Sequence, residues 1–305
     1  MVVQYPKRHA LKRSNLGVIV KILLAVIFWG ASFVGTKIAL RDAQPVTVVW
    51  VRFGIGVLVL GAAVIRRRQF KLPPARDLGY FALIGALGIT WHQWLQSTGL
   101  LTAQATTSAW IVASTPIFMA LLGWIFFKET LSLLRVAGIF IAAFGVLMVV
   151  TKGDLRSLSL GQFGTRGDLL MLISSPNWAV FSALSRNGLR RYPAALMMLY
   201  VMAFGWLFTT GLFVTGPGFT DLANLTVNGW AAVAYLGIAC SGLAYIFWYD
   251  ALQVLPSAHV GVFLYIEPLV TVVVAGFLLA EPVYLAALAG GAIILLGVWL
   301  VNRRA

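Results

Sequence analysis

The stretch Ile111-Val-Ala-Ser-Thr-Pro-Ile-Phe-Met-Ala-Leu-Leu-Gly-Trp-Ile-Phe-Phe-Lys-Glu129 returns in pattern 152 residues later, as Phe263-Leu-Tyr-Ile-Glu-Pro-Leu-Val-Thr-Val-Val-Val-Ala-Gly-Phe-Leu-Leu-Ala-Glu281. Each copy is a long apolar run that a proline breaks near its middle and an acidic residue closes, and Pro116 aligns with Pro268 without a gap. Duplicated halves with helix breakers at corresponding positions are typical of membrane proteins that expose a binding site to each side in turn. The repeat therefore predicts the class of protein before any single residue is considered.

The composition points the same way. Hydrophobic residues make up 60% of the chain and charged residues 10%, whereas soluble domains carry about a quarter charged residues. We therefore predict an all-α integral membrane protein whose main surroundings are the lipid bilayer. The net charge of +14 is spread over short connectors and forms no stripe, which favours a role in membrane orientation over nucleic-acid binding. The single cysteine, Cys240, excludes an internal disulfide and a cysteine-built metal site, and we interpret it as a packing residue.

Ten apolar segments are long enough to cross the membrane. Each has about the 20 residues that a helix needs to span some 30 Å of hydrocarbon. The connectors are short, which leaves no room for a second soluble domain, and the basic N-terminus leads into a first span that is too long for a signal peptide. The predicted spans are 18–40, 46–65, 78–99, 104–126, 134–151, 167–188, 194–214, 228–250, 258–280 and 284–302.

The positions of lysine and arginine predict the orientation. With the N-terminus inside, most basic residues lie in the inner segments, and the outer connectors hold only Arg41, Lys152, Arg156 and Arg166. This distribution places both termini in the cytoplasm. Because each half has an odd number of spans, the halves 1–151 and 152–305 enter the membrane from opposite sides. They are therefore predicted to form two inverted five-helix repeats.

The order of these motifs resembles a known family. The opening Trp29-Gly-Ala-Ser-Phe33 with Lys37 is matched by Trp178 with Arg186, and both precede the proline and glutamate pairs and glycine-rich fifth and tenth helices. Together they resemble the drug/metabolite transporter superfamily, EamA type, over essentially the whole chain, and the aromatic interior looks most like the YddG-type aromatic amino-acid exporters. The resemblance implies a multi-pass secondary transporter of the bacterial inner membrane that needs no cofactor. One departure is Pro176-Asn177-Trp178-Ala179 opposite Phe28-Trp29-Gly30.

Depth and helical phase select candidate residues. Trp29, Trp178 and Glu267 lie 9 to 11 residues into their helices, roughly 14 to 17 Å deep, where such transporters hold their substrate. Polar side chains at this depth cost free energy when they face lipid, so they should face the interior. The predicted substrate-binding residues are Trp29, Phe33, Trp91, His92, Gln96, Trp110, Ser114, Asn177, Trp178, Phe181, Tyr245, Tyr265 and Glu267.

Several of these residues have a second interpretation. Glu267 is predicted either to bind a substrate amino group or relay a proton, or to bond the backbone that Pro268 frees. His92 fits a cavity wall or an interhelical hydrogen bond. Trp29 and Trp178 fit a cavity wall or lipid-facing packing.

Other polar and aromatic residues are predicted to have structural roles. Lys37 and Arg186 lie near helix ends, where their charged groups can extend into water. This interpretation is at least as good as ligand binding. Glu129 and Glu281 open the fifth and tenth helices and are interpreted as N-terminal caps. Trp206 has no polar companions and is assigned to packing, while Trp50 and Trp230 suit the interfacial belt.

The leading hypothesis is a secondary transporter that exports small amphipathic solutes by alternating access. Aromatic amino acids fit best, because their rings stack on tryptophan and tyrosine. A cationic drug exporter of the same fold is the first alternative, and an intramembrane enzyme, a channel or a sensor is more remote. The spans hold no nucleophile–base motif and no metal-binding motif, and the chain has no ATP-binding loop, so we predict that it is not an enzyme and that a solute or proton gradient drives it.

The two aligned prolines are predicted to be hinges. Pro116 and Pro268 each remove one mid-span hydrogen bond, which leaves the carbonyls of Val112 and Leu264 without their usual donor. Such carbonyls are tolerated only beside a cavity or a protein partner. We therefore expect both kinks to border the substrate path.

Overall fold

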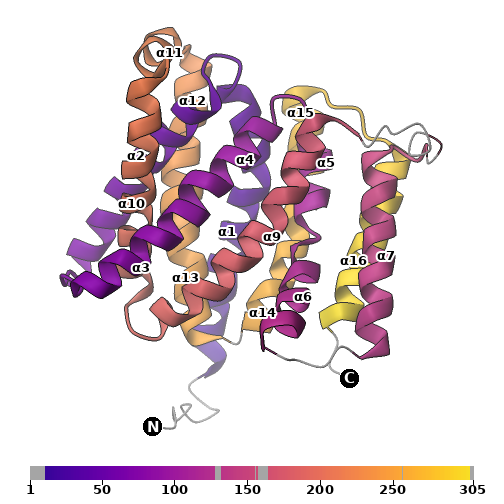
Figure 1. The fold of residues 1–305 in the computed structure, drawn as a ribbon, viewed down its shortest axis with the longest axis horizontal. Helices are drawn as coiled ribbons and strands as arrows, with labels where there is room; N and C mark the ends of the chain where they lie inside the picture. The colour runs from indigo at the N-terminus through magenta and orange to yellow at the C-terminus, as the bar shows by residue number, and fades with distance from the viewer. Residues whose placement is uncertain (1–10, 128–131, 155, 157–163, 256, 303–305) are drawn as a thin grey trace.

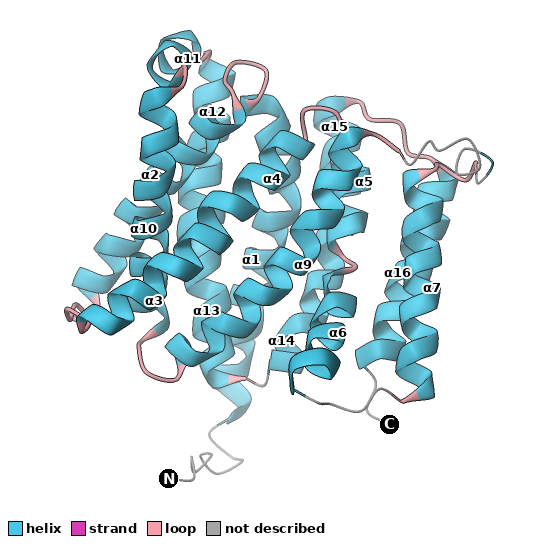
Figure 2. Cartoon of the chain, in the orientation of Figure 1, coloured by secondary structure: helices cyan, strands magenta, loops and turns pink. Residues whose placement is uncertain are grey.

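The chain folds into a bundle of helices. The computed structural model describes the 305 residues except 1–10, 128–131, 155, 157–163, 256 and 303–305. Helices joined by short connectors make up the described part, which contains no strand (Figure 2). An α-helix satisfies its backbone hydrogen bonds internally, and this is what a chain with so many apolar residues needs in lipid. The protein is thus all-helical, as the composition predicts.

Eight helical stretches in the described residues are long and apolar enough to cross a membrane. They coincide with eight of the ten predicted spans. The other two predicted spans, 78–99 and 167–188, are also helical, but they carry more polar side chains, among them Gln93 and Asp168. The number ten therefore stays a prediction.

The first half of the chain contributes seven helical elements and one π-helix. Proline at the start of α2 is favourable because the first helical N–H has no partner in any case. The elements are α1 (Leu11–Ala39), α2 (Pro45–Arg66), α3 (Ala75–Gly85), the π-helix η1 (Ala86–Trp91), α4 (His92–Gly99), α5 (Ala105–Val112), α6 (Thr115–Phe127) and α7 (Leu133–Val150).

The second half follows the same order. Thr165 and Asp168 form a reciprocal capping box that starts its first helix. The elements are α9 (Arg166–Leu189), α10 (Ala194–Thr215), α11 (Gly218–Asn224), α12 (Val227–Tyr235), the π-helix η2 (Leu236–Leu243), α13 (Ala244–Val254), α14 (Ser257–Gly261), the 3-10 helix η3 (Val262–Ile266), α15 (Glu267–Leu279) and α16 (Leu285–Asn302).

The helix boundaries keep the offset seen in the sequence. Elements α3, α4, α5, α6 and α7 begin at residues 75, 92, 105, 115 and 133, and α12, α13, α14, α15 and α16 begin 152 residues later, at 227, 244, 257, 267 and 285. The third span of each half also contains a π-helix. The two halves thus share their breaks as well as their helices.

Helices α7 and α16 pack against each other at one side of the bundle (Figure 1). A Cβ on Gly138 would lie 2.6 Å from the carbonyl oxygen of Gly297, and a Cβ on Gly145 would lie 2.7 Å from that of Gly290. Gly290 and Gly297 are the counterparts of Gly138 and Gly145 at the 152-residue offset. The contact is therefore reciprocal and antiparallel, which is the pattern that a two-fold axis perpendicular to the helices requires. Only glycine permits so close an approach.

The remaining helices enclose two main clusters of buried side chains. The larger cluster extends from α1 and α2 to α10 and α13, and includes Trp29, Phe181 and Tyr245. The second lies between α5, α7 and α16 and includes Phe33 and Trp110. The first helix begins and the last helix ends at the same end of the bundle (Figure 1).

Candidate functional site

Two π-helices, η1 and η2, interrupt the third span of each half. A π-turn widens the helix and disturbs its hydrogen-bond ladder, and such turns are frequent at functional sites. In η1 the carbonyl oxygen of Leu87 accepts a hydrogen bond from Asn177 Nδ2, at 2.9 Å. In η2 the carbonyl oxygen of Cys240 accepts one from Trp29 Nε1, at 3.1 Å. Each donor belongs to the first helix of the opposite half, so α1 and α9 hold corresponding positions against the two π-helices.

An aromatic group surrounds the Trp29 side of this arrangement. The Trp29 ring is buried, and its centroid lies 5.6 Å from that of Tyr245 in an edge-on contact and 5.2 Å from that of Trp248. Gly30 lets α15 approach α1, since a Cβ there would lie 2.6 Å from the carbonyl oxygen of Glu267. The structure thus brings together Trp29 and Tyr245, both predicted from the sequence, in the protein interior.

A second group surrounds the η1 side. The ring of His92 lies 4.9 Å from that of Trp178, which in turn lies 5.0 Å from Phe181. His92 is buried, and its Nδ1 atom has no hydrogen-bond partner within the described part of the chain. A buried polar atom without a partner is costly, so its retention needs an explanation.

Arg52 connects the two groups, and the sequence analysis did not select it. Its Nε donates to Ser241 Oγ at 2.8 Å and its Nη1 donates to Gln93 Oε1 at 3.1 Å. Only 5% of this residue is exposed, so its positive charge lies in the interior of the protein. The signal was present in the sequence, because an arginine well inside an apolar span marks a functional site by default.

We call Trp29, Arg52, His92, Gln93, Asn177, Trp178, Ser241 and Tyr245 the central site. Its members come from α1, α2, α4, α9, η2 and α13, and five of them were predicted from the sequence. Close packing of α2 on η2 supports the arrangement, because Gly56 lies one turn after Arg52 and a Cβ there would lie 2.8 Å from the Cβ of Ser241. The site combines aromatic rings, a cation and neutral hydrogen-bonding groups.

Glu267 lies at the first position of α15, beside α1. Its carboxylate forms no hydrogen bond or ion pair with the described residues. The carbonyl oxygen of Leu264 instead accepts a hydrogen bond from the backbone N–H of Glu267. The structural interpretation, in which the carboxylate bonds the backbone that Pro268 frees, is therefore wrong.

Several predicted residues lie away from the central site. The Tyr265 hydroxyl accepts a hydrogen bond from Asn302 Nδ2, 2.7 Å away at the last turn of α16. Trp91 is half-exposed and stacks on Trp94. Phe33 and Trp110 pack in the second buried cluster, where Trp110 covers Gly291 of α16. These contacts of Phe33, Trp91, Trp110 and Tyr265 thus lie outside the rings around Trp29 and His92.

The hinge prolines lie at real breaks, but the carbonyls near them are not free. Thr115 Oγ1 donates to the carbonyl oxygen of Val112 at 2.6 Å, and Ser114 Oγ donates to that of Ile111 at 2.6 Å. In the second half the backbone N–H of Glu267, the residue after η3, donates to the carbonyl oxygen of Leu264. The prediction of unpaired carbonyls is corrected, because the chain supplies local partners. The remaining predicted residue, Gln96, is partly buried on α4.

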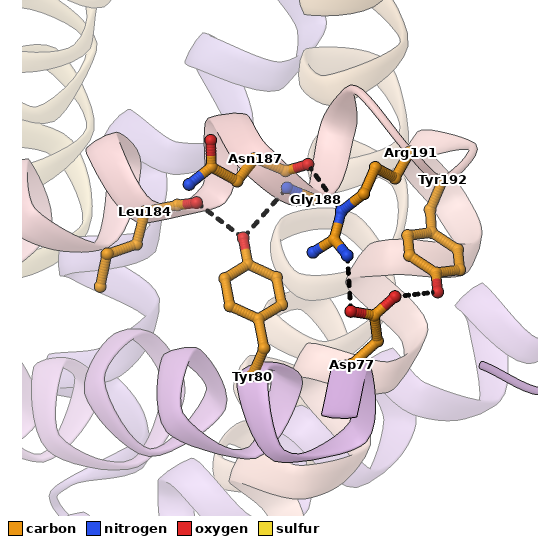
Figure 3. Close-up of polar contacts among 7 residues, drawn as sticks. All are labelled: Asp77, Tyr80, Leu184, Asn187, Gly188, Arg191 and Tyr192. Atoms are coloured by element: carbon orange, nitrogen blue, oxygen red, sulfur yellow. Dashed lines mark hydrogen bonds and ion pairs between the residues drawn. The ribbon is translucent and has the colours of Figure 1, made fainter. Parts of the chain in front are cut away.

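The end of the bundle predicted to face the cytoplasm has a hollow of about 530 Å³ lined by Arg76, Asp77, Tyr80, Asn187, Arg190 and Arg191. Arg191 Nη1 and the Tyr192 hydroxyl each donate to the Asp77 carboxylate at 2.5 Å, and the Tyr80 hydroxyl donates to the carbonyl oxygen of Leu184 at 2.6 Å (Figure 3). The hydrogen bond from Tyr192, with the Arg191 guanidinium, lowers the pKa of Asp77 below its usual value. The same bond raises the pKa of Tyr192. These contacts join α3 to the α9–α10 corner.

At the opposite end of the bundle, carboxylates cap the first turns of helices that are far away in the sequence. Glu281 accepts hydrogen bonds from the backbone N–H groups of Ala105 and Thr106, at 2.9 and 3.1 Å, and lies 3.4 Å from Lys37 Nζ. The sequence predicted that Glu281 caps the tenth helix, and this prediction is wrong, because Glu281 caps α5. Its partners Ala105 and Thr106 lie 176 and 175 positions away in the sequence. Glu129 lies outside the described residues.

Two further carboxylates act alike at this end. Asp42 accepts from Thr226 at the start of α12, and Asp221 accepts from Gln44 and Thr47 at the start of α2. Helix N-termini carry partial positive charge and free N–H groups, which suit carboxylates. Within the described ranges, no three of the His, Cys, Asp and Glu side chains gather closely enough to hold a metal ion.

The sequence matches the EamA-like transporter family twice, over residues 16–151 and again over residues 165–303. A protein of Archaeoglobus fulgidus, described as an uncharacterized transporter, is 30% identical over 93% of this chain and 96% of its own length. A protein of Streptantibioticus cattleyicolor, described as a probable terminal-alkyne amino-acid exporter, is 28% identical over 93% of this chain and 92% of its own. A solved crystal structure is 18% identical and has a TM-score of 0.64 over 93% of this chain and 96% of that one, so it shares the fold.

Proposed function

This chain belongs to the EamA-like transporter family, a group of membrane transporters and not of enzymes, and from that premise we propose that it exports small amphipathic solutes, aromatic amino acids in particular. The observation that carries the proposal is the central site. There, two tryptophans at corresponding positions of the two halves lie beside polar groups: Trp29 donates to the π-helix η2, and Trp178 packs on His92, the residue that follows η1. Aromatic rings stack favourably on such side chains, while the polar groups suit the charged end of an amino acid.

Alternating access gives these residues a mechanism. In this proposal the ten spans form two inverted repeats, 1–151 and 152–305, with both termini in the cytoplasm of a bacterium and the bundle in its inner membrane. The reciprocal glycine contact of α7 with α16 supports a two-fold relation between the halves. The α5–α6 break at Ala113–Ser114 and the η3–α15 junction at Glu267 are then equivalent bending points, one in each half.

The name of the Streptantibioticus cattleyicolor relative supports the amino-acid class, because that protein is described as an amino-acid exporter. A cationic drug exporter is the second candidate, and the observation that favours it is the carboxylate of Glu267, which has no cationic partner among the described residues. The two candidates agree on the mechanism and differ in the charge of the solute.

Counterflow in proteoliposomes tests the proposal. The purified full-length protein is reconstituted into vesicles loaded with unlabelled phenylalanine, and the uptake of labelled phenylalanine is followed. Tryptophan, tyrosine, leucine, phenethylamine and ethidium are tested as competitors, with protein-free vesicles as the control. We expect counterflow that tryptophan and tyrosine inhibit most strongly. Inhibition by ethidium and phenethylamine alone would support the cationic candidate, and chemical conversion of phenylalanine would contradict transport.

A further inference from the structure

Arg52 has unused hydrogen-bonding capacity in the interior of the protein. A guanidinium has five N–H donors, and the structure assigns one from Nε to Ser241 and one from Nη1 to Gln93. Both acceptors are neutral. Three donors, enough for a bidentate contact with a carboxylate, have no assigned acceptor among the described residues.

No carboxylate of the described residues neutralises this charge. Asp42, Asp221 and Glu281 cap helices at one end of the bundle, while Asp77 and Asp250 pair with arginines at the other. Glu267 forms no ion pair with Arg52 within 4.0 Å. A buried charge without a counter-ion is strongly destabilising, so an arginine at this position indicates that an anion compensates it for part of the working cycle.

The surroundings of Arg52 fit an organic anion with an aromatic body. His92 adjoins Gln93, is 4% exposed, and has an Nδ1 atom without a partner in the described part of the chain. The Trp178 ring covers the imidazole of His92 at 4.9 Å. On the other side, Ser241 follows Cys240, whose carbonyl oxygen holds the Trp29 indole. A ligand whose anionic group lies at Arg52 therefore has aromatic rings from both halves beside it.

We propose that Arg52, with Gln93 and His92, binds the carboxylate of the transported solute, an inference that rests on the proposed function. The transporter then selects aromatic carboxylates, amino acids among them, over aromatic amines that lack a carboxylate. Arg52 also has no counterpart in the second half. The first helices of the halves align at an offset of 149 residues, since Trp29 matches Trp178, and at this offset position 201 is Val201. The carboxylate subsite thus belongs to one half only, and the solute binds in one orientation.

The test compares three probes that share one ring. Phenylalanine has both charges, phenylalaninamide lacks the carboxylate, and 3-phenylpropionate lacks the ammonium group. The concentration of each probe that half-inhibits phenylalanine counterflow is measured for the full-length protein and for Arg52→Gln. We expect the half-inhibitory concentrations of the two carboxylates to rise about ten- to a hundredfold, as the loss of a charge-assisted hydrogen bond predicts, and that of the amide to change less than about twofold.

Gln93→Glu provides a second variant in case Arg52→Gln does not fold. It places a carboxylate at the position of Gln93 Oε1, 3.1 Å from Arg52 Nη1, and so neutralises the guanidinium without changing the shape of the side chain. It should weaken binding of the carboxylate probes in the same way. Arg66→Gln, which removes an exposed arginine at the end of the same helix, is the control and should behave as the wild type does.

The outcomes separate this subsite from the function on which it rests. Equal weakening of all three probes, or none, in a folded Arg52 variant would overturn the subsite while phenylalanine transport stands. If the wild type transports no aromatic solute, thermal stabilisation by octanoate and by octanamide is measured instead. Stabilisation by octanoate that Arg52→Gln abolishes would retain the carboxylate subsite and reject only the aromatic cargo. No stabilisation by octanoate would overturn both.

Discussion

At the scale of single residues, the structure distinguishes polar groups whose partners join two helices from polar groups that keep unpartnered atoms within the described part of the chain. Asp77 belongs to the first kind, because Arg191 and Tyr192 occupy its carboxylate. Arg52 and His92 belong to the second kind, because donors of the one and Nδ1 of the other have no partner among the described residues.

The Asp77 contact predicts how one end of the bundle responds to pH. Because the pKa of Asp77 is lowered, the contact is complete above the ordinary carboxyl value of about 3.9 and is lost only as pH falls through the lowered pKa. Because the pKa of Tyr192 is raised, its hydroxyl keeps donating past pH ~10. Asp77→Asn should therefore lower the melting temperature by the same amount at pH 5 and at pH 9.

Thermal melts of the detergent-solubilised protein across this range provide the measurement, and the difference from wild type should shrink only below about pH 4. Tyr192→Phe, which keeps the ion pair with Arg191, should have the smaller effect. A difference that changes between pH 5 and pH 9 would contradict this assignment.

The residues that the sequence located are those whose depth and helical phase suffice to place them, such as Trp29 and Trp178. Arg52 shows the limit of this approach. Its partners Gln93 and Ser241 lie 41 and 189 positions away, so no local pattern connects them. Glu281 shows the same limit, since the helix that it caps lies in the other half of the chain.

At the scale of helices, close glycine contacts hold α7 and α16 together. A Cβ on Gly138 would meet the carbonyl oxygen of Gly297 at 2.6 Å, whereas a Cβ on Gly61 of α2 would meet nothing within 4 Å. Gly138→Ala should therefore lower the free energy of unfolding by about 1–3 kcal/mol. Gly61→Ala should leave it unchanged or raise it by up to about 1 kcal/mol, because alanine favours helix. Chemical unfolding in detergent measures both, and equal effects would show that this contact is not tight.

The two broken spans predict a second result at this scale. Pro116→Ala and Pro268→Ala each restore a backbone donor and should favour a straight helix, so the fold should gain stability while phenylalanine counterflow slows several-fold. Pro45→Ala at the start of α2, where a turn and not another helix precedes the proline, is the matched control and should change neither. Unchanged counterflow in both variants and in the double variant would place the moving part elsewhere.

Helix periods and apolar runs locate the spans but do not reveal their interruptions. The π-helices η1 and η2 lie within runs that the sequence predicts as continuous helices, whereas the 3-10 helix η3 directly precedes Pro268, where the sequence predicts a break. Each π-helix accepts a hydrogen bond from the other half, Leu87 from Asn177 and Cys240 from Trp29. The local sequence therefore predicts where each span lies, but it does not predict where a π-helix interrupts the span.

At the scale of the whole molecule, the offset of 152 residues in the sequence returns in the helix boundaries and in the reciprocal glycine pairs. The proposed inverted arrangement of the two halves predicts which connectors face the cytoplasm. In a Cys240→Ala background, single cysteines in the connector 66–77 and near both termini should react with a membrane-impermeant maleimide only from the cytoplasm, and one in the connector 152–166 only from outside. A C-terminus accessible from outside would contradict the inverted arrangement.

The most direct test of a transport site between the two π-helices compares three tryptophans in one counterflow assay. Trp29 and Trp178 lie in the central site, while Trp206 donates to the carbonyl oxygen of Trp50 at 3.1 Å and stacks on its ring, away from that site. At equal expression and folding, Trp29→Ala and Trp178→Ala should each slow phenylalanine counterflow about tenfold, and Trp206→Ala should leave it close to wild type. Equal losses in all three variants would show that the solute does not bind between the π-helices.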